Sequence, residues 1–223
     1  MAHIDPIART DLNHLEGVLA GTEASMGFVP NSMLTMAHMP QLTMAFSMLA
    51  GVVFGADLRP MMAAYSDMVP VDDAADEALS PQLVQLIAYA VSLSAGCRYC
   101  QAHTSHSGHR RGVDEEKFAQ ILDYENSSEF SDAEKALVAL SLAAGQVPNE
   151  SDNHHFQALK LHFSERQIVQ VVAVIALFGF LNRWNDTMAT ELEPGPVDFA
   201  SAVLAESGWS VGKHGGASGD QKT

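Results

Sequence analysis

The chain has 223 residues, enough for one substantial hydrophobic core or two small ones. Hydrophobic residues make up 47% of the chain, which excludes a disordered protein. The 27 acidic and 12 basic side chains give a formal net charge of -15. This charge disfavours binding to the phosphate backbone of nucleic acids, so we predict a solvated acidic surface and no nucleic-acid partner.

The sequence shows no signal for a membrane or for secretion. The N-terminus lacks a basic segment followed by an apolar stretch. The longest apolar run, 168–181, is interrupted by Gln170 and Gly179 and is shorter than the roughly 20 residues of a membrane span. We predict that this run forms a buried helix, either in the core or between subunits. The expected location is the cytoplasm.

Helical periodicity is common along the chain, whereas strand signals are nearly absent. The first expected helix is capped by Asp11. A short helix is expected after Pro30, through His38, and Pro40 opens a third. The acidic stretch 70–78 is typical of a loop.

The second half of the chain carries clear helix starts and stops. Ser80-Pro81 predicts a helix that ends at Ala95-Gly96, followed by a helix from near Cys97 to about Arg111. Further helix starts are expected at Asp114, at the capping box Ser131–Glu134, and at the capping box Ser164–Gln167, which leads into the apolar helix that continues to about Leu192.

We therefore predict an all-α fold without a domain linker. Two helical blocks, 10–68 and 80–192, are joined by the acidic loop. We expect one helical domain over 1–195, with its chemistry concentrated at about 80–115, and a C-terminal segment over 196–223. The tail after Trp209 is rich in Gly, Ser, Lys and Asp, which predicts disorder.

The two cysteines are separated by two residues, as Cys97-Arg-Tyr-Cys100. Residues three and four apart share one face of a helix, so the two sulfurs can form a disulfide across one turn. Cys97 stands at the helix N-terminus, where free N–H groups and the helix dipole favour a thiolate. His103 lies one turn beyond Cys100 and can exchange a proton. These groups suit peroxide reduction or disulfide exchange.

A metal site is the main rival interpretation. Cys97, Cys100, His103 and His106 have a zinc-like spacing. On one helix, however, the first and last are separated by about 13 Å of rise, so one tetrahedral ion cannot bind all four. A zinc site would need ligands from elsewhere in the chain. A pair of inert buried thiols is a further alternative.

A polar cluster, 182–186, follows the apolar run and contains Trp184. We interpret it as a helix end that satisfies buried polar groups. The alternative is that this cluster closes a pocket over the cysteines.

Two segments, 79–85 and 94–103, resemble the AhpD-like, carboxymuconolactone decarboxylase superfamily in its peroxidase-related branch. Segments 27–31 and 182–187 look like other parts of that branch, so the resemblance covers most of 20–195. It implies an all-helical subunit that assembles into a homo-oligomer (trimer, dimer or hexamer). It also implies an antioxidant alkylhydroperoxidase activity that uses a hydroperoxide substrate and a dithiol or protein-disulfide reductant.

The resemblance also implies roles for the cysteines, with Cys100 peroxidatic and Cys97 resolving. The helix dipole favours the opposite order. We follow the resemblance on these roles, because access and a nearby base can outweigh the dipole.

The sequence departs from the family pattern at two positions. Gln85 stands where the family has its proton-relay carboxylate, and glutamine cannot transfer a proton at neutral pH. Thr104 stands where the family has a histidine, and His103 is one position earlier. We expect His103 to substitute for that histidine, with help from Tyr99 or from a residue on another helix.

The sequence thus predicts a thiol-dependent hydroperoxidase or disulfide oxidoreductase that uses no metal or cofactor. The candidate catalytic residues are Cys97, Cys100, His103, Gln85 and Tyr99. Two alternatives stay open. One is a non-catalytic, redox-sensing or binding oligomer, and the other is a decarboxylase-type lyase of the same superfamily.

Overall fold

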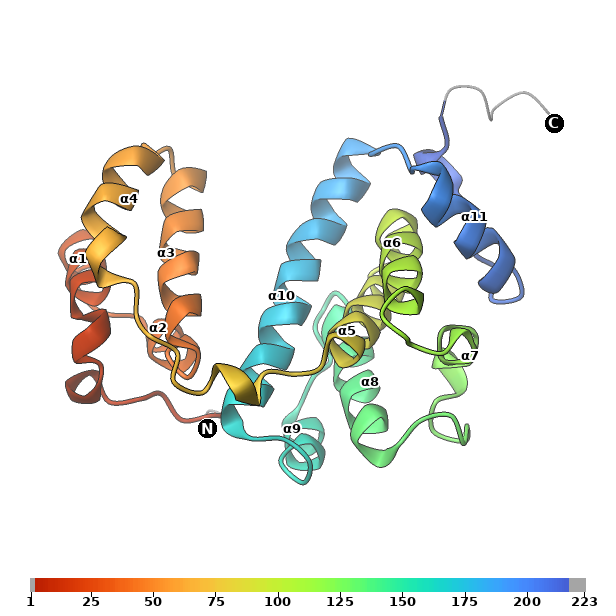
Figure 1. Cartoon of the computed structure of the whole chain (residues 1–223), viewed down its shortest axis with the longest axis horizontal. Helices are drawn as coiled ribbons and strands as arrows, with labels where there is room; N and C mark the ends of the chain where they lie inside the picture. The colour runs from red at the N-terminus through yellow and green to blue at the C-terminus, as the bar shows by residue number, and fades with distance from the viewer. Residues whose placement is uncertain (1–2, 217–223) are drawn as a thin grey trace. The chain divides into compact units, whose positions relative to one another are not determined.

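The computed structural model describes residues 3–216. Within these residues the secondary structure consists of α-helices and short 3-10 turns, with no strand, so the all-α prediction is confirmed. The chain divides into two compact units (Figure 1): residues 1–78 with 164–170, and residues 79–163 with 171–223. The expectation of one domain over 1–195 stays a prediction, and each unit is described by itself.

The first unit contains four α-helices. They are α1 (Glu16–Met26), α2 (Asn31–Met36), α3 (Pro40–Val53) and α4 (Leu58–Tyr65). Apolar side chains of α1, α2 and α3 form a buried cluster that includes Leu15, Leu19 and Met33. The helices after Pro30 and at Pro40 were expected, whereas α4 was not.

The first helix begins later than its apolar pattern predicted. Asp11 lies in a 3-10 turn, and a second such turn precedes α1, so Asp11 does not cap the helix. The unexpected helix α4 is capped by Asp57, whose carboxylate accepts the backbone N–H of Arg59.

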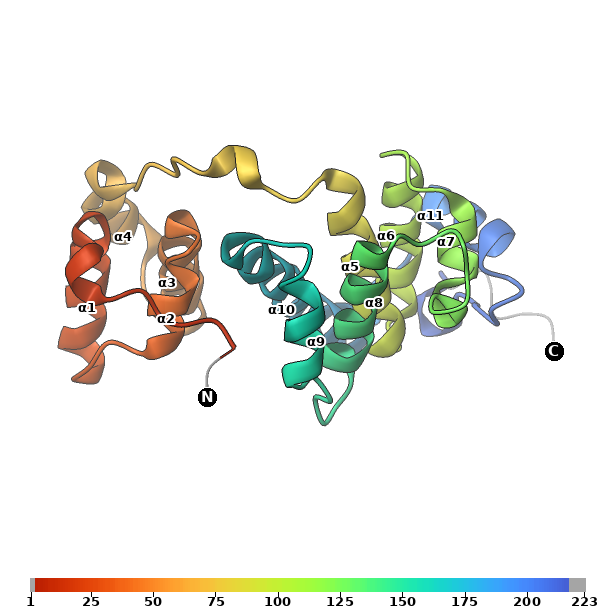
Figure 2. The ribbon, with the colours of Figure 1, turned by 90° about the horizontal axis from the view of Figure 1, so that it is seen from below.

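The second unit holds the paired cysteines. Its helices are α5 (Pro81–Ser94), α6 (Arg98–His109), α7 (Glu115–Ala119), α8 (Asp132–Gly145), α9 (Asn153–Leu159), the part of α10 (Glu165–Met188) from residue 171 onward, and α11 (Pro194–Val203). Helix α5 packs against α6 and α8, and α11 packs against α6 and α7 (Figures 1 and 2). Apolar residues of these helices, among them Leu86, Tyr89 and Phe118, form the core. The central hairpin α5–α6 is therefore covered by α8 and α11.

The capping signals predicted the helix starts well. Ser80, Asp114 and Ser131 each accept a backbone N–H of the first turn that follows. Ser164 and Gln167 exchange the two hydrogen bonds of a capping box at the start of α10. Helices α9 and α11 were not expected.

Helix α10 is more exposed than predicted. It ends at Met188 rather than near Leu192, and only 28% of its most apolar window is buried inside the structure. Leu177, Phe180 and Trp184 are exposed in the single chain, so burial in the core of one chain is wrong for this side of the helix, and its packing between subunits stays a prediction. By length and composition alone, α10 is the one described helix that is long and apolar enough to cross a membrane.

The C-terminal segment returns to α6. The indole N–H of Trp209 donates to the carbonyl of Arg98 over 3.2 Å. A 3-10 turn, Gly212–His214, follows, and the backbone N–H of Leu192 donates to the carbonyl of His214. The predicted disorder after Trp209 is therefore wrong for this stretch, since these contacts fix it, and the prediction for 217–223 lies outside the described residues.

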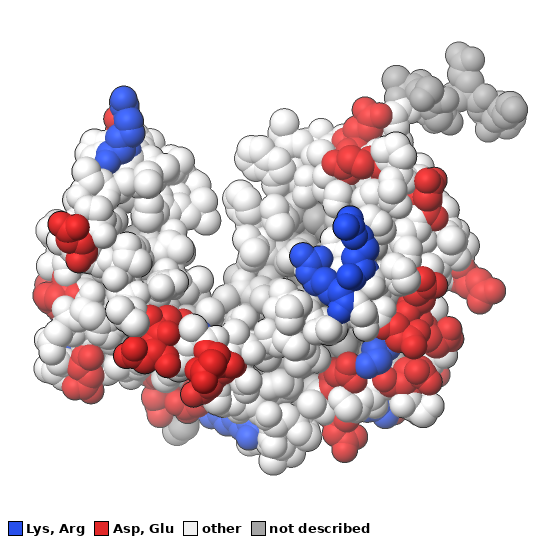
Figure 3. Space-filling model, viewed as in Figure 1, with Lys and Arg blue, Asp and Glu red and all other residues white. Residues whose placement is uncertain are grey.

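Acidic side chains are widespread on the face shown in Figure 3, where basic side chains are few. Among the described ion pairs, the pair between Lys117 and Glu134 is largely buried, whereas the pair between Arg59 and Asp57 is exposed. The acidic excess is thus mainly a property of the solvated surface, as expected from composition.

The close packing of α5 on α8 predicts that Gly145→Ala destabilises the protein. A Cβ atom at this position would lie 2.8 Å from Ser94 Cβ and 2.9 Å from the carbonyl oxygen of Val91. We expect a loss of about 1–3 kcal/mol in the free energy of unfolding, measured by urea denaturation of the full chain. The control Gly179→Ala, with a nearest neighbour at 3.6 Å, should gain up to about 1 kcal/mol. Equal stability of the two variants would contradict this packing.

Candidate active site

The site begins at the turn between α5 and α6. Gly96 has a φ of 77°, a left-handed conformation that glycine adopts without strain. The next residue, Cys97, is extended and is the N-cap of α6. Its sulfur accepts the backbone N–H of Cys100 over 3.4 Å. The local sequence thus places one sulfur at the positive end of the α6 dipole.

Cys100 lies in the first turn of α6, close to Cys97. Both cysteines are free thiols, and their exposed fractions are only 1% and 2%. The side-chain amide of Asn185, on α10, donates to the sulfur of Cys100 over 3.5 Å. The thiols are therefore buried, but polar groups lie beside them.

The two thiols have opposite acidities. The hydrogen bond from the Cys100 side chain lowers the pKa of Cys97, burial opposes this effect, and the backbone N–H of Cys100 lowers the pKa further. The same hydrogen bond raises the pKa of Cys100, together with burial and the negative charge of Cys97. The arrangement therefore favours a Cys97 thiolate next to a protonated Cys100.

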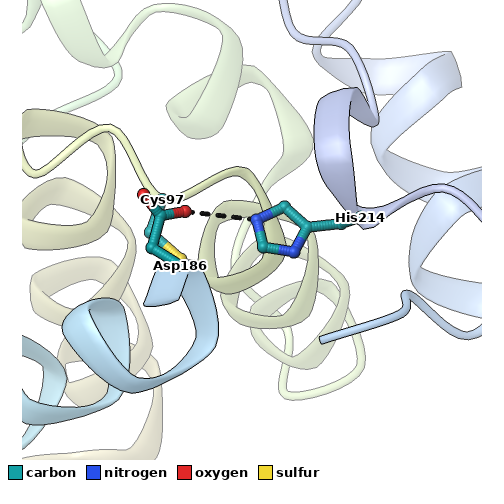
Figure 4. A group of neighbouring side chains, drawn as sticks. All are labelled: Cys97, Asp186 and His214. Atoms are coloured by element: carbon teal, nitrogen blue, oxygen red, sulfur yellow. Dashed lines mark hydrogen bonds and ion pairs between the residues drawn. The ribbon is translucent and has the colours of Figure 1, made fainter. Parts of the chain in front are cut away.

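Asp186 and His214 bring a carboxylate and an imidazole to Cys97 (Figure 4). One potential ligand atom from each of the three side chains lies within 4.8 Å of the other two. His214 is buried, and its Nε2 lies 3.2 Å from Asp186 Oδ1. Its Nδ1 lies 2.8 Å from the carbonyl oxygen of Thr190. Lys213 pairs with the second oxygen of Asp186 over 3.2 Å.

His103 and Tyr99 form a second polar group with Glu193. His103 Nε2 lies 2.6 Å from Glu193 Oε2, and the hydroxyl of Tyr99 donates to Oε1 over 3.3 Å. The rings of Tyr99 and His103 are stacked, with centroids 4.4 Å apart. Burial and the charge of Glu193 raise the pKa of Tyr99. The strongest contact of His103 is therefore with a carboxylate.

The two family departures lie on neighbouring helices, Gln85 on α5 and Thr104 on α6. Gln85 packs against Gly108, because a Cβ at Gly108 would lie 3.3 Å from Gln85 Cβ. Gly108 is eight residues beyond Cys100, about 12 Å along α6, so the Cβ of Gln85 lies beside the later part of that helix. The buried hydroxyl of Thr104 donates to the carbonyl of Cys100 over 2.7 Å.

A pocket of about 550 Å³ lies next to the group formed by Cys97, Asp186 and His214, with Asp186 in its wall. Asp186 and Lys213 line it together with Asn182 and Arg183, and its apolar part comes from α5, α8 and α10. The amide nitrogen and oxygen of Asn182 are both buried without a hydrogen-bond partner. An unpartnered buried amide is costly, so it suits a polar group of a ligand that enters the pocket.

The sequence pointed to some of these residues and missed others. The polar cluster 182–186 lies in the last turns of α10, as interpreted, and Asn185 and Asp186 also lie at the cysteines. The alternative that the cluster closes a pocket over the cysteines stays a prediction. His214 and Glu193 were missed. His214 was hidden in a tail expected to be disordered, and its sequence neighbours carry no motif.

This fold and site define an all-helical protein with a buried, hydrogen-bonded dithiol. Residues 60–141 match the Carboxymuconolactone decarboxylase family. The chain is also 30% identical to the debrominase Bmp8, over 90% of this chain and 97% of Bmp8, with a TM-score of 0.53. The chain belongs to the AhpD-like, carboxymuconolactone decarboxylase superfamily.

Two further comparisons agree with this assignment. A cysteine-to-alanine variant of Bmp8 in complex with 2,3,4-tribromopyrrole is 30% identical over 91% of this chain and 98% of that chain, with a TM-score of 0.55. The uncharacterized protein YnjA of Escherichia coli (strain K12) is 26% identical over 110 residues, which is 49% of this chain. The match spans 60% of the length of YnjA.

The opposite acidities predict different pH profiles for alkylation of the two thiols. Alkylation requires the thiolate, so a lowered pKa shifts the rise in rate to lower pH. In Cys100→Ser, the serine hydroxyl can still donate to Cys97, so the pH midpoint for alkylation of Cys97 should lie below about 8.5, the value for an unperturbed thiol. In Cys97→Ser, Cys100 stays buried, so the pH midpoint for its alkylation should lie above about 8.5.

The measurement is the iodoacetamide rate between pH 5 and 10, followed by mass spectrometry. Both variants unfolded in urea serve as controls and should titrate at about 8.5. A midpoint for Cys97 above that value would contradict the geometry described here.

Proposed function

We propose that the protein is a thiol-dependent hydroperoxidase in which Cys97 attacks the peroxide and Cys100 resolves the product. The observation that carries this proposal is the sulfur of Cys97 at the N-cap of α6, within hydrogen-bonding reach of Cys100. This order reverses the roles implied by the family resemblance. It is supported by the opposite acidities of the two thiols.

The chemistry takes two steps. The Cys97 thiolate attacks the terminal oxygen of the hydroperoxide, the O–O bond breaks, and the alkoxide takes a proton and leaves as an alcohol. Cys97 is then a sulfenic acid. The thiol of Cys100 displaces water from it, and a Cys97–Cys100 disulfide forms. A dithiol or a protein-disulfide reductant returns the pair to the reduced state by exchange.

Acid–base groups for these steps come from outside the helix of the cysteines. His214 and Asp186 are next to Cys97, so we assign them the delivery of the proton to the alkoxide. His103 and Tyr99 are held by Glu193 and are assigned a positioning role near Cys100. Gln85 has no assigned part in proton transfer, since its amide cannot donate a proton to a leaving group at neutral pH.

The buried thiols require a route for the substrate. We propose the pocket beside Asp186 as this route, because Asp186 lies both in its wall and next to Cys97. Its mixed lining, with apolar residues and the unpartnered amide of Asn182, suits a small organic hydroperoxide better than a large substrate.

Hydroperoxide reduction is tested on the reduced, metal-free full chain with one equivalent of cumene hydroperoxide. The expected product by mass spectrometry is the Cys97–Cys100 disulfide. Cys100→Ser should still consume one equivalent and stop at a sulfenic acid on Cys97, trapped with dimedone. Cys97→Ser should lose the fast reaction. If Cys97→Ser reacts and Cys100→Ser does not, the order of roles is the one that the resemblance implies.

Reductive debromination is a second candidate function. It is favoured by the similarity to the debrominase Bmp8 over nearly the whole length of both chains. The electron balance is the same, because an organic bromide and two thiols yield the debrominated product, a disulfide, bromide and a proton. The same dithiol can thus serve either substrate class.

A polybrominated pyrrole discriminates between the two functions. We expect the reduced protein to release bromide more slowly than it reduces the hydroperoxide at equal substrate concentration, measured by ion chromatography. Cys97→Ser is the control and should release none. Faster release of bromide than of alcohol would make debromination the main activity.

The remaining alternatives predict different behaviour. A redox sensor would form the disulfide once but would not turn over with a dithiol reductant. A decarboxylase-type lyase would not need the cysteine pair. We also propose that the protein is cytoplasmic, since a dithiol enzyme needs a compartment that keeps thiols reduced. The family resemblance supports the further proposal that it is a homo-oligomer.

A further inference from the structure

Cys97, Asp186 and His214 come from three separate parts of the second unit. Cys97 is the N-cap of α6, Asp186 lies near the end of α10, and His214 ends the 3-10 turn of the C-terminal segment. Their side chains point toward one another (Figure 4), and one ligand atom of each lies within 4.8 Å of the other two. Thiolate, carboxylate and imidazole are the donor types that bind zinc in proteins.

The hydrogen bonds of His214 leave the place between Nε2 and Asp186 to a proton or to a metal ion. The carbonyl oxygen of Thr190, 2.8 Å from Nδ1, can only accept, so Nδ1 carries a proton. In a neutral ring, Nε2 then presents its lone pair to Asp186 Oδ1, only 3.2 Å away. Two acceptors at this distance repel each other unless a second proton or a metal ion lies between them. A carbonyl on the other ring nitrogen is also the usual partner of a metal-binding histidine.

The distances fit a metal ion as well as a proton. Two ligands on a tetrahedral zinc ion, with bonds of about 2.0–2.1 Å, are about 3.3 Å apart. The separation of His214 Nε2 and Asp186 Oδ1 is 3.2 Å. The sulfur of Cys97 lies within 4.8 Å of both atoms, so a shift of at most about 1 Å brings it to the same ion.

The surroundings allow an ion to enter and stay. Cys97 and His214 are buried, and Asp186 lines the 550 Å³ pocket that opens to solvent. Lys213 holds the second oxygen of Asp186 and leaves Oδ1 for the ion. The sulfur of Cys100 lies next to Cys97 and is available as a fourth ligand, with water as the alternative.

We propose that the reduced protein binds one thiophilic divalent cation, Zn²⁺ above all, through Cys97, Asp186 and His214. This set differs from the zinc spacing on one helix that the sequence analysis set aside. His103 of that set is engaged by Glu193, and His106 packs against the ring of Phe199. Binding releases the thiol proton of Cys97 and forms a metal–sulfur bond.

Metal binding has a consequence for the redox pair, and this part of the inference rests on the proposed function. A sulfur bonded to zinc is withheld from peroxide, so the ion protects the reduced dithiol. Formation of the Cys97–Cys100 disulfide removes the thiolate ligand and releases the ion. The dithiol would then exist as a metal-bound reserve and a metal-free, reactive form.

The experiment is a titration of the reduced full chain with Co²⁺ under argon, followed by Zn²⁺. A near-ultraviolet thiolate-to-cobalt band should grow to one equivalent and disappear when zinc displaces cobalt. His214→Gln and Asp186→Asn should each weaken cobalt binding at least about tenfold, and Cys97→Ser should abolish or strongly reduce the band. In Cys100→Ser, a band reduced by about half identifies Cys100 as the fourth ligand, and an unchanged band identifies water.

The matched control is His154→Gln, which removes an exposed histidine from the only other described cluster of this kind, Asp152, His154 and His155. It should leave the band and the affinity unchanged. Circular dichroism checks that each variant is folded. The absence of a one-equivalent band in the folded, reduced wild-type chain would overturn the proposal, as would unchanged binding in His214→Gln and Asp186→Asn. The titration contains no oxidant, so its failure is distinguishable from a failure of hydroperoxide reduction.

Discussion

The geometry of the second unit depends on the sulfur of Cys97 occupying the N-cap of α6. Gly96 ends α5 in a left-handed conformation, and Cys97 follows with an extended backbone, so its side chain closes the first turn of the next helix. Serine, threonine or aspartate would fill this position in most helices. Here the capping atom is a thiol sulfur, the nucleophile of the proposed mechanism, and the N–H group that it accepts belongs to the second cysteine, Cys100. This contact starts the helix and adds to the hydrogen bond from the Cys100 side chain, which is the larger cause of the lowered pKa of Cys97.

The remaining groups of the site are brought in by tertiary packing. Asn185, which donates to Cys100, is 85 residues further along the chain. His214 is held by the carbonyl of Thr190 and by Asp186, in a segment whose Trp209 is anchored to the first turn of α6. The helical hairpin thus supplies the sulfurs, and α10 with the C-terminal segment supplies the charges around them. In the proposed mechanism, Asp186 and His214 therefore take the acid–base role that the family pattern gives to a carboxylate at position 85.

The sequence predicted well what is fixed by local interactions. Helix starts at Ser80, Asp114, Ser131 and Ser164 are determined by side chains that bond their own first turn, and such signals are readable from a few residues. The proximity of the two cysteines followed from the helical repeat in the same way.

The part of the site that the sequence could not predict depends on contacts between distant segments. Nothing in the glycine-rich neighbourhood of His214 indicates that it packs against α6 and α10, because the stabilising partners, Thr190 and Asp186, are in other elements. The exposed side of α10 shows a related limit of sequence patterns. An apolar run indicates that a helix has surface to bury, but not where that surface is covered.

Cys97 and His214 are 117 positions apart in the chain, and this separation affects when the site is complete during synthesis. The cysteine hairpin leaves the ribosome long before the segment that carries the imidazole, so the early chain presents two thiols without this neighbour. Proteolytic cleavage between Trp209 and His214 would return a mature molecule to that state, with the α5–α6 hairpin intact.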